Sequence, residues 1–441
     1  MTKPFVWGVA TSAFQVEGAR DEAGKGESIW DRFSDEGRIR SPGVVDHYHH
    51  LEEDLDLLAD LGVDAYRFST AWTRVVPDGD GEINQAGIDF YRRLVEGLVE
   101  RGIEPFPTLY HWDLPQALQD SGGWASRRTI DAFARYATIM AESLGDHVGR
   151  WITQNEPWVT AFLGYRDGTF APGLKDWETA LVVGHNLLLS HGRAARSIRK
   201  VLPGAPVGIA LDCRPSLPAD DDALAANRYF DGFRNRWFFD AVFGRGYPED
   251  IVAVYTERGH LTSGLDGMVH EGDMEEIAVP IDFLGINYYT TLTISGDREE
   301  SDEPEGPVGP GAPEGFTEMG WRNDPKGLTD FLITVSETYG PESMLVTENG
   351  ASYSDAPDAR GRVADSRRIE YLDAHIDAVL AARKAGAPAD GYFVWSLLDN
   401  LEWVEGFGQR FGLVWVDTET GTRTPKDSFH WYRERIGSTR V

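Results

Sequence analysis

Two glutamates in this chain follow short apolar runs, at positions where buried strands are expected to end. Glu156 lies in the segment 153–157, directly after an apolar lead-in over residues 148–152. Glu348 lies in the segment 347–350, after a second apolar run. A charged carboxylate is costly to bury unless it is paired or takes part in chemistry. Both positions are therefore candidates for catalytic groups, with a structural ion pair as the alternative for either one alone.

Pro157 removes a backbone donor, and we expect it to prevent a helix from starting directly after Glu156. The chain continues as another apolar run over residues 158–163. The pattern predicts a strand that ends here and holds Asn155 and Glu156 out at its tip.

Two carboxylates that face one pocket can hydrolyse a glycosidic bond. One carboxyl protonates the leaving oxygen, while the other attacks the anomeric carbon or activates a water molecule. Carboxyls about 5–5.5 Å apart give retention of configuration, and a clearly wider gap gives inversion. Because the two glutamates are distant in the sequence, this chemistry needs a fold that brings their strands to one pocket.

Other apolar runs also end in polar and aromatic residues, and these suit a sugar. Amide, imidazole and carboxylate groups form the directional hydrogen bonds that hydroxyls need, and indole faces cover the C–H faces of a pyranose. These residues are Gln15, His111, Trp112, Asn287, Tyr288, Tyr289, Trp395, Glu402 and Trp403. Trp395 and Trp403 could instead be core residues. Arg67 could keep a nucleophile ionised or pair with a structural acid.

Apolar runs alternate with segments of helical periodicity, which predicts an α/β fold, a single (β/α)8 TIM barrel with extended βα loops. The expected strands are 6–11, 64–69, 103–109, the strand before Glu156, 207–211, 281–287, 344–347 and 391–395. The expected helices are 46–61, 88–99, a helix from the N-cap Ser126 to Leu144, 178–201, 224–243, 325–339, 366–385 and 425–436. Residues 15–18 are expected to form a loop, and residues 295–318 an exposed, mobile excursion.

No linker separates two halves of the chain, so we expect one catalytic domain over residues 1–441 rather than a two-domain doubly wound sheet. In a barrel of this type, chemistry is located at the carboxyl ends of the strands. Functional residues are therefore expected directly after each apolar run.

The chain is strongly acidic, with 42 Lys+Arg against 72 Asp+Glu and a formal charge of −30. This charge argues against nucleic acid and anionic membranes as partners, and it disfavours an anionic substrate. An acidic, solubility-enhancing surface is the simpler explanation, and a salt-tolerant source is the alternative. A single cysteine, Cys213, favours a reducing compartment. With no signal-peptide pattern at the N-terminus and no membrane-spanning apolar run, we expect a soluble cytoplasmic protein.

Neither a metal nor a cofactor is expected. The histidines of segment 47–50 lack the i, i+4 spacing of metalloprotease motifs, so we expect them to cap or pack at the start of a helix. Gly24 and Gly26 lack the strand–turn–helix context and the lysine of a phosphate-binding loop.

The chain resembles the family 1 glycoside hydrolases, and most of all the bacterial β-glucosidases of that family. The resemblance covers nearly the whole length. Its motifs are segments 5–18, 66–69, 111–113, 153–157, 287–289, 346–350, 395–400, 402–403 and 410–413. Leu401 stands where the family often has Phe, which affects only local packing.

The resemblance implies that Glu156 is the general acid/base and Glu348 the nucleophile of a retaining double displacement. Asn287 and Tyr289 would then orient the nucleophile, and Arg67 would support it. The residues implied to bind the non-reducing sugar are Gln15, His111, Trp112, Asn155, Trp395, Glu402 and Trp403. The residues implied to border the aglycone are Trp158 and Phe170.

The implied substrates are neutral β-glucosides and short oligosaccharides, with β-galactosides and β-fucosides as further candidates. Relatives that cleave phospho-sugars usually have small residues in place of Glu402 and Trp403, and Glu402 would repel a phosphate. The first alternative is a non-catalytic carbohydrate-binding protein, which would lack one of the glutamates. The second is an S-glycosidase, which would carry Gln in place of Glu156. Homo-oligomerisation and the extent of transglycosylation stay open.

Overall fold

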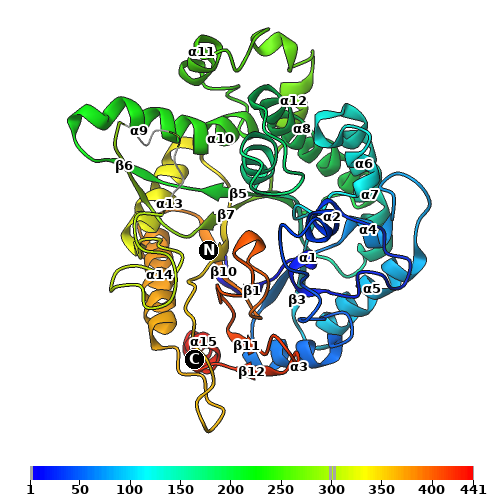
Figure 1. The fold of residues 1–441 in the computed structure, drawn as a ribbon, viewed down its shortest axis with the longest axis vertical. Coiled ribbons are helices and arrows are strands. Elements are labelled where there is room, and N and C mark those ends of the chain that lie inside the picture. Colours follow the sequence, from blue (N-terminus) through cyan, green and yellow to red (C-terminus); the bar gives the residue numbers. More distant parts are fainter. Residues whose placement is uncertain (1–2, 297–299, 301–303, 441) are drawn as a thin grey trace.

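Eight parallel strands form a closed barrel in the computed structural model, which describes residues 3–296, 300 and 304–440 (Figure 1). The barrel strands are β1 (Val6–Ala10), β2 (Ala65–Ser69), β3 (Glu104–Tyr110), β4 (Trp151–Asn155), β5 (Val207–Cys213), β7 (Phe283–Tyr288), β9 (Met344–Asn349) and β10 (Ala389–Trp395). Their order around the barrel is β1-β10-β9-β7-β5-β4-β3-β2. The predicted barrel is therefore confirmed, and each predicted strand overlaps an observed one.

The long helices pack around the outside of the barrel (Figure 1). They are α3 (Leu51–Leu61), α5 (Gln85–Glu100), α7 (Arg127–Leu144), α8 (Trp177–Val201), α13 (Pro325–Tyr339), α14 (Ser366–Lys384) and α15 (Asp427–Ser438). The region predicted as one helix over 224–243 comprises α9 (Leu224–Asp231), the π-helical segment η4 (Gly232–Arg236) and α10 (Trp237–Val242).

Shorter elements decorate the loops. The short helices are α1 (Ala13–Val16), α2 (Ile29–Asp35), α4 (Trp72–Val75), α6 (Gln116–Gln119), α11 (Glu249–Glu257) and α12 (Asp273–Ile277). Two small sheets pair β6 (Ser216–Pro218) with β8 (Leu292–Ile294) and β11 (Val414–Val416) with β12 (Arg423–Pro425).

Aromatic side chains fill the barrel interior below the strand ends. Phe106 lies between Phe283 and Phe393, with ring centroids 5.3 Å and 5.4 Å away. Gly8 leaves room for this layer, because a Cβ at that position would lie 2.2 Å from the ring of Phe393. The interior is therefore a packed core, which leaves the space beyond the carboxyl ends of the strands for a ligand.

Helical structure begins at Pro157, so the expectation that this proline prevents a helix is wrong. Proline is favourable at the first helical position, because the N–H that it lacks would have no intrahelical acceptor there. The turn continues as the π-helical segment η2 (Val159–Arg166). Glu156, directly before the helix, has a φ of 50°.

Four other expectations need full or partial correction. Gln15 and Val16, the first half of the expected loop 15–18, belong to the helical turn α1, and α3 begins at Leu51 rather than at residue 46. Ser126 occupies the predicted N-cap position of α7, but its side chain makes no capping hydrogen bond. Within segment 295–318, residues 297–299 and 301–303 lie outside the described residues. Thr317 and Glu318 are buried, so the segment is not exposed throughout.

The histidines near the start of α3 pair with different carboxylates. His47 binds the buried Asp54 at 2.7 Å, whereas His49 and His50 bind carboxylates nearer the surface. Among residues 3–296, 300 and 304–440, no group of three or more His, Cys, Asp or Glu side chains is placed to hold a metal ion. Within the same ranges, no helix has the length and apolarity needed to cross a bilayer.

Candidate active site

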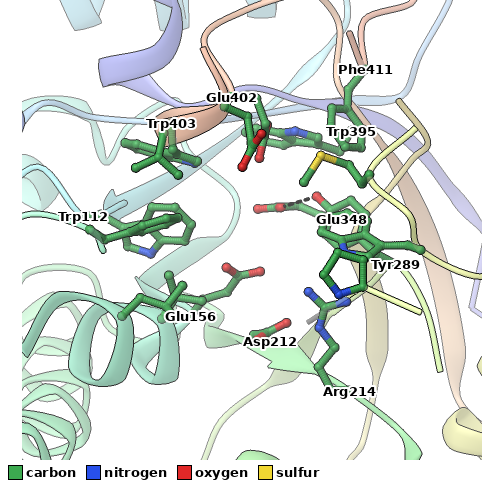
Figure 2. Close-up of a pocket in the computed structure, with 18 of the residues that line it drawn as sticks. Trp112, Glu156, Asp212, Arg214, Tyr289, Glu348, Trp395, Glu402, Trp403 and Phe411 are labelled. Carbon is green, nitrogen blue, oxygen red and sulfur yellow. Dashed lines mark hydrogen bonds between the residues drawn. The ribbon is translucent and has the colours of Figure 1, made fainter. Parts of the chain in front are cut away.

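A cavity of about 250 Å³ opens at the carboxyl ends of the barrel strands (Figure 2). Nine residues proposed from the sequence line it: His111, Trp112, Glu156, Phe170, Tyr289, Glu348, Trp395, Glu402 and Trp403. Glu156 and Glu348 point toward one another across the cavity in Figure 2. The fold thus brings together the two carboxyls that the sequence places far apart.

Glu348, at the end of β9, is buried against a cation. Arg67 Nη1 donates to its Oε1 at 2.6 Å, and Tyr289 Oη donates to its Oε2 at 2.8 Å. Burial raises the pKa of Glu348, while the Arg67 guanidinium and then the Tyr289 hydroxyl oppose that rise. The acid that Arg67 pairs with is therefore the candidate nucleophile itself, which decides between the two roles considered for Arg67.

Glu156, just beyond the end of β4, accepts a hydrogen bond from an amide rather than from a cation. Asn287 Nδ2 donates to Glu156 Oε1 at 2.7 Å. Burial raises the pKa of Glu156 well above its usual range, and the charges of Asp212 and Glu348 raise it further. This surrounding favours the protonated acid, in contrast to the guanidinium-bound Glu348.

One buried network links the two carboxyls. Arg67 Nη2 donates to Asn155 Oδ1 at 2.6 Å, and Asn287 Nδ2 donates to the same oxygen at 3.0 Å. Thr347 Oγ1 donates to Asn287 Oδ1 at 2.6 Å and so holds that amide. Side chains from β2, β4, β7 and β9 therefore fix the two acids relative to each other before any substrate binds.

Aromatic rings form one wall of the cavity. Trp403 lies 4.5 Å from Trp112 and 6.2 Å from His111 between ring centroids, and Trp395 stacks on His111 at 5.8 Å. Burial, together with the nearby charge of Arg67, lowers the pKa of His111 well below its usual range. A neutral imidazole beside indole faces is suited to the hydroxyls and C–H groups of a sugar.

The backbone at this wall is strained. Trp112, Glu156 and Trp403 have φ values of 79°, 50° and 41°, in the left-handed region that non-glycine residues rarely occupy. All three line the cavity. Such conformations persist where the surrounding structure enforces them, typically at functional sites.

The surroundings of Glu402 in this cavity favour its neutral form. Desolvation, followed by the charges of Glu348 and Glu405, raises its pKa to about 8. A protonated carboxyl can donate a hydrogen bond to a sugar hydroxyl. The expected charge repulsion between Glu402 and a phosphate is therefore weakened, and the bulk of Trp403 becomes the main obstacle to a phosphorylated sugar.

Six proposed residues lie behind the wall instead of lining the cavity: Gln15, Arg67, Asn155, Trp158, Asn287 and Tyr288. Gln15 Nε2 donates to Asn400 Oδ1 at 3.0 Å and to the Leu401 carbonyl at 2.7 Å, next to Glu402. Trp158, expected at the aglycone side, is buried and does not line the cavity. Its ring packs under Arg234 and against Phe233, because the helix that starts at Pro157 turns it inward.

Sequence reasoning missed several lining residues. Asp212 ends β5, Arg234 comes from η4, and Met319 and Trp321 follow segment 295–318. Asp212 directly follows the apolar run 207–211, so the rule that functional residues follow apolar runs could have identified it. No comparable signal marks Met319 or Trp321, because only long-range folding brings them to the cavity.

Tyr289→Phe tests the hydrogen bond to Glu348. Loss of the hydroxyl removes a contact that lowers the pKa of Glu348, so that pKa should rise. Since the ionised form is required for attack, the acidic limb of the kcat/KM profile should move to higher pH. At acidic pH the loss should be about tenfold or more, because a hydrogen bond to a charged group contributes about 1.5–3 kcal/mol.

The control for this measurement is Tyr288→Phe. Tyr288 is the neighbouring tyrosine, but its side chain is buried and its hydroxyl donates to the Asp324 carbonyl at 2.6 Å, away from both acids. The acidic limb of the kcat/KM profile of Tyr288→Phe should stay in place. An unmoved limb in Tyr289→Phe would contradict the role given to this hydroxyl.

One acid bound by a cation and one whose surroundings favour the proton match the two roles that glycosidic cleavage requires. At the carboxyl end of a (β/α)8 barrel, beside an aromatic wall, this pair makes the protein a glycoside hydrolase. The chain belongs to glycosyl hydrolase family 1, whose family model matches residues 1–440. The alternative of a non-catalytic carbohydrate-binding protein finds no support.

Curated relatives match over nearly their whole length. "Beta-glucosidase A" of Acetivibrio thermocellus is 42% identical over 450 residues, covering 98% of this chain and 97% of the relative. A "Bifunctional beta-D-glucosidase/beta-D-fucosidase" of Bifidobacterium breve is also 42% identical, covering 98% and 97%. Among solved structures, a β-glucosidase from Thermotoga maritima in complex with glucoimidazole is 41% identical with a TM-score of 0.89, covering 99% of both chains.

Proposed function

We propose that this protein is a retaining β-glucosidase that removes terminal non-reducing β-D-glucosyl residues, with Glu348 as nucleophile and Glu156 as general acid/base. The observation that carries the proposal is the asymmetry of the two facing carboxyls. Arg67 and Tyr289 donate to Glu348, whereas burial and neighbouring acids favour a proton on Glu156.

In the first step the ionised Glu348 attacks the anomeric carbon from below the ring. Glu156 gives its proton to the leaving glycosidic oxygen at the same time, and the aglycone departs. The Arg67 guanidinium and the Tyr289 hydroxyl aim the attacking carboxylate. The product of this step is a covalent glucosyl–enzyme.

In the second step the roles at Glu156 reverse. The carboxylate left after proton transfer removes a proton from an incoming water molecule, which attacks the anomeric carbon and releases Glu348. Two inversions give net retention. The network through Asn155 and Asn287 keeps Glu156 in place during both steps.

Neutral β-glucosides and short oligosaccharides such as cellobiose are the substrates we propose, with β-D-galactosides and β-D-fucosides as further ones. The relative with both glucosidase and fucosidase in its name supports the β-fucoside. We also propose that residues 1–441 form one catalytic domain and that the enzyme is cytoplasmic. The binding contacts proposed for Gln15, His111, Asn155, Trp395 and Glu402 belong to the same hypothesis.

A panel of nitrophenyl glycosides tests the substrate assignment. β-Glucoside should be cleaved with the highest kcat/KM, β-fucoside and β-galactoside less well, and α-glucoside not measurably. β-Glucoside 6-phosphate should react at least about 100-fold more slowly, since it has to displace Trp403 or lose the hydration of its phosphate beside Glu402 and Glu405. A preference for the phosphorylated or the α-linked substrate would contradict the proposal.

A further inference from the structure

A third carboxylate, Asp212, lies beside the acid/base at the end of the neighbouring strand. The Glu156 backbone N–H donates to the Ala210 carbonyl at 2.9 Å, which ties β4 to β5 at this level. Ala210 belongs to the barrel interior, and Asp212, two residues further along β5, lies on the same face of the strand. Figure 2 shows its carboxylate directed into the cavity near Glu156.

The register between β5 and β7 gives a second structural connection between Asp212 and Glu156. Asp212 is paired with Asn287 on β7, and Asn287 is the residue that donates to Glu156 Oε1. Asp212 and the amide that holds the acid/base are therefore immediate neighbours across two strands. The position of Asp212 relative to Glu156 is set by the barrel itself rather than by a loop.

Arg234 holds the Asp212 carboxylate in an ion pair. Its guanidinium lies 3.3 Å from the ring centroid of Trp158, and the side chain is almost fully buried. Trp158 belongs to the helix that starts directly after Glu156, so one packed unit contains the acid/base, the indole, the guanidinium and Asp212. Arg234 comes from the π-helical segment η4, a type of distortion that is frequent at functional sites.

Asp212 and Arg234 shift the pKa of Glu156 in opposite directions. After burial, the charge of Asp212 is the largest influence that raises the pKa of Glu156, and the charge of Arg234 lowers it. Asp212 also raises the pKa of Glu348, as the smallest of the influences on that group. In the part of the chain that the structure describes, the other titratable or charged groups around the cavity are Arg67, His111, Arg214, Tyr289, Glu402 and Glu405.

We propose that Asp212, anchored by Arg234, is a positioning residue whose fixed negative charge keeps the acid/base Glu156 protonated between turnovers and so sets the alkaline limit of activity. This inference rests on the proposed role of Glu156. Asp212 is no proton donor in it, because its carboxylate is the anionic member of the ion pair with Arg234. Its effect is through space and through the shared neighbour Asn287.

The test is the pH dependence of kcat/KM for nitrophenyl β-glucoside in Asp212→Asn. Removing the like charge, and with it the carboxylate that offsets the charge of Arg234 in their ion pair, should both lower the pKa of Glu156. The basic limb should then move to lower pH by about one unit, which is about a tenfold fall in the ratio of alkaline to acidic kcat/KM. The acidic limb should move in the same direction by less.

The variant Arg234→Met should shift the basic limb in the opposite direction. It keeps bulk over Trp158 and removes the charge that lowers the pKa of Glu156, so its basic limb should move to higher pH. The double variant Asp212→Asn/Arg234→Met removes both charges of this ion pair and should have a limb between those of the single variants. It serves as the folded test protein if one single variant unfolds, because a lone buried charge is destabilising.

Basic limbs that stay in place while activity falls equally at every pH would overturn the inference and leave a structural role only. So would limbs that move in the same direction in both single variants. Glu156→Ala separates this failure from failure of the proposed function. If Glu156 is the acid/base, that variant loses the basic limb altogether, whatever the state of Asp212.

Discussion

Glu348→Gly is expected to abolish hydrolysis of β-glucosides, with a fall in kcat on the order of 10⁵-fold, as for nucleophile deletions in other hydrolases. The covalent intermediate cannot form without the carboxylate that Arg67 and Tyr289 aim. Azide should restore turnover, because a small anion fits the space left by the side chain. It attacks from the face that Glu348 occupied, so the product should be the α-glucosyl azide, with inverted configuration.

The product's anomeric configuration, read by proton NMR, is the decisive measurement. Glu342→Gly is the matched control, since Glu342 is exposed and precedes the opposite end of β9. That variant should keep wild-type activity and show no response to azide. Near-wild-type hydrolysis by Glu348→Gly without azide would exclude Glu348 as the nucleophile.

The barrel strands were predictable because parallel strands covered on both faces are nearly continuous apolar runs. The end of β4 shows where that signal stops. Thr153, Gln154 and Asn155 are polar yet fully buried within the strand, because each finds a partner inside the protein. Thr153 Oγ1 contacts His191 Nδ1 at 2.6 Å, and such pairing between distant residues leaves no trace in periodicity.

The acid pair was predictable for a related reason. In a parallel barrel the strand ends share one face, so a carboxyl after an apolar run is a candidate whatever its partner. The same rule applies to Asp212, which was missed because no recognised motif includes it. Its partner Arg234 comes from η4, inside a region that periodicity presents as one uninterrupted helix.

The loop residues of the site were not predictable. Trp321 reaches the cavity because the end of segment 295–318 is anchored by contacts remote in sequence. Glu318 Oε2 accepts the Ser354 backbone N–H at 2.7 Å, and Gln409 Nε2 donates to the Glu318 carbonyl at 3.2 Å. Composition indicates an exposed loop here, and only the tertiary contacts bury its end.

Glu156→Ala should produce a defect that depends on the leaving group. General acid catalysis contributes about 10²–10⁴-fold, and the loss should approach the upper end with alkyl glucosides or cellobiose, whose alkoxide leaving groups need a proton. With dinitrophenyl β-glucoside the leaving group is dinitrophenolate, which departs without protonation. The first step on this substrate should therefore be nearly normal. The glucosyl–enzyme should then accumulate, because no base activates water, and a burst of dinitrophenol with a low KM should follow.

Azide distinguishes this variant from the nucleophile variant. It needs no general base, so it should speed the second step of Glu156→Ala and give the β-glucosyl azide, with retained configuration. Glu142→Ala on the exposed face of α7, the helix before β4, should show neither the burst nor the response to azide. If alkyl and dinitrophenyl glucosides lost activity by equal factors in Glu156→Ala, proton donation to the leaving group would have to come from another residue. The two azide products, α from Glu348→Gly and β from Glu156→Ala, therefore assign each carboxyl to one face of the sugar.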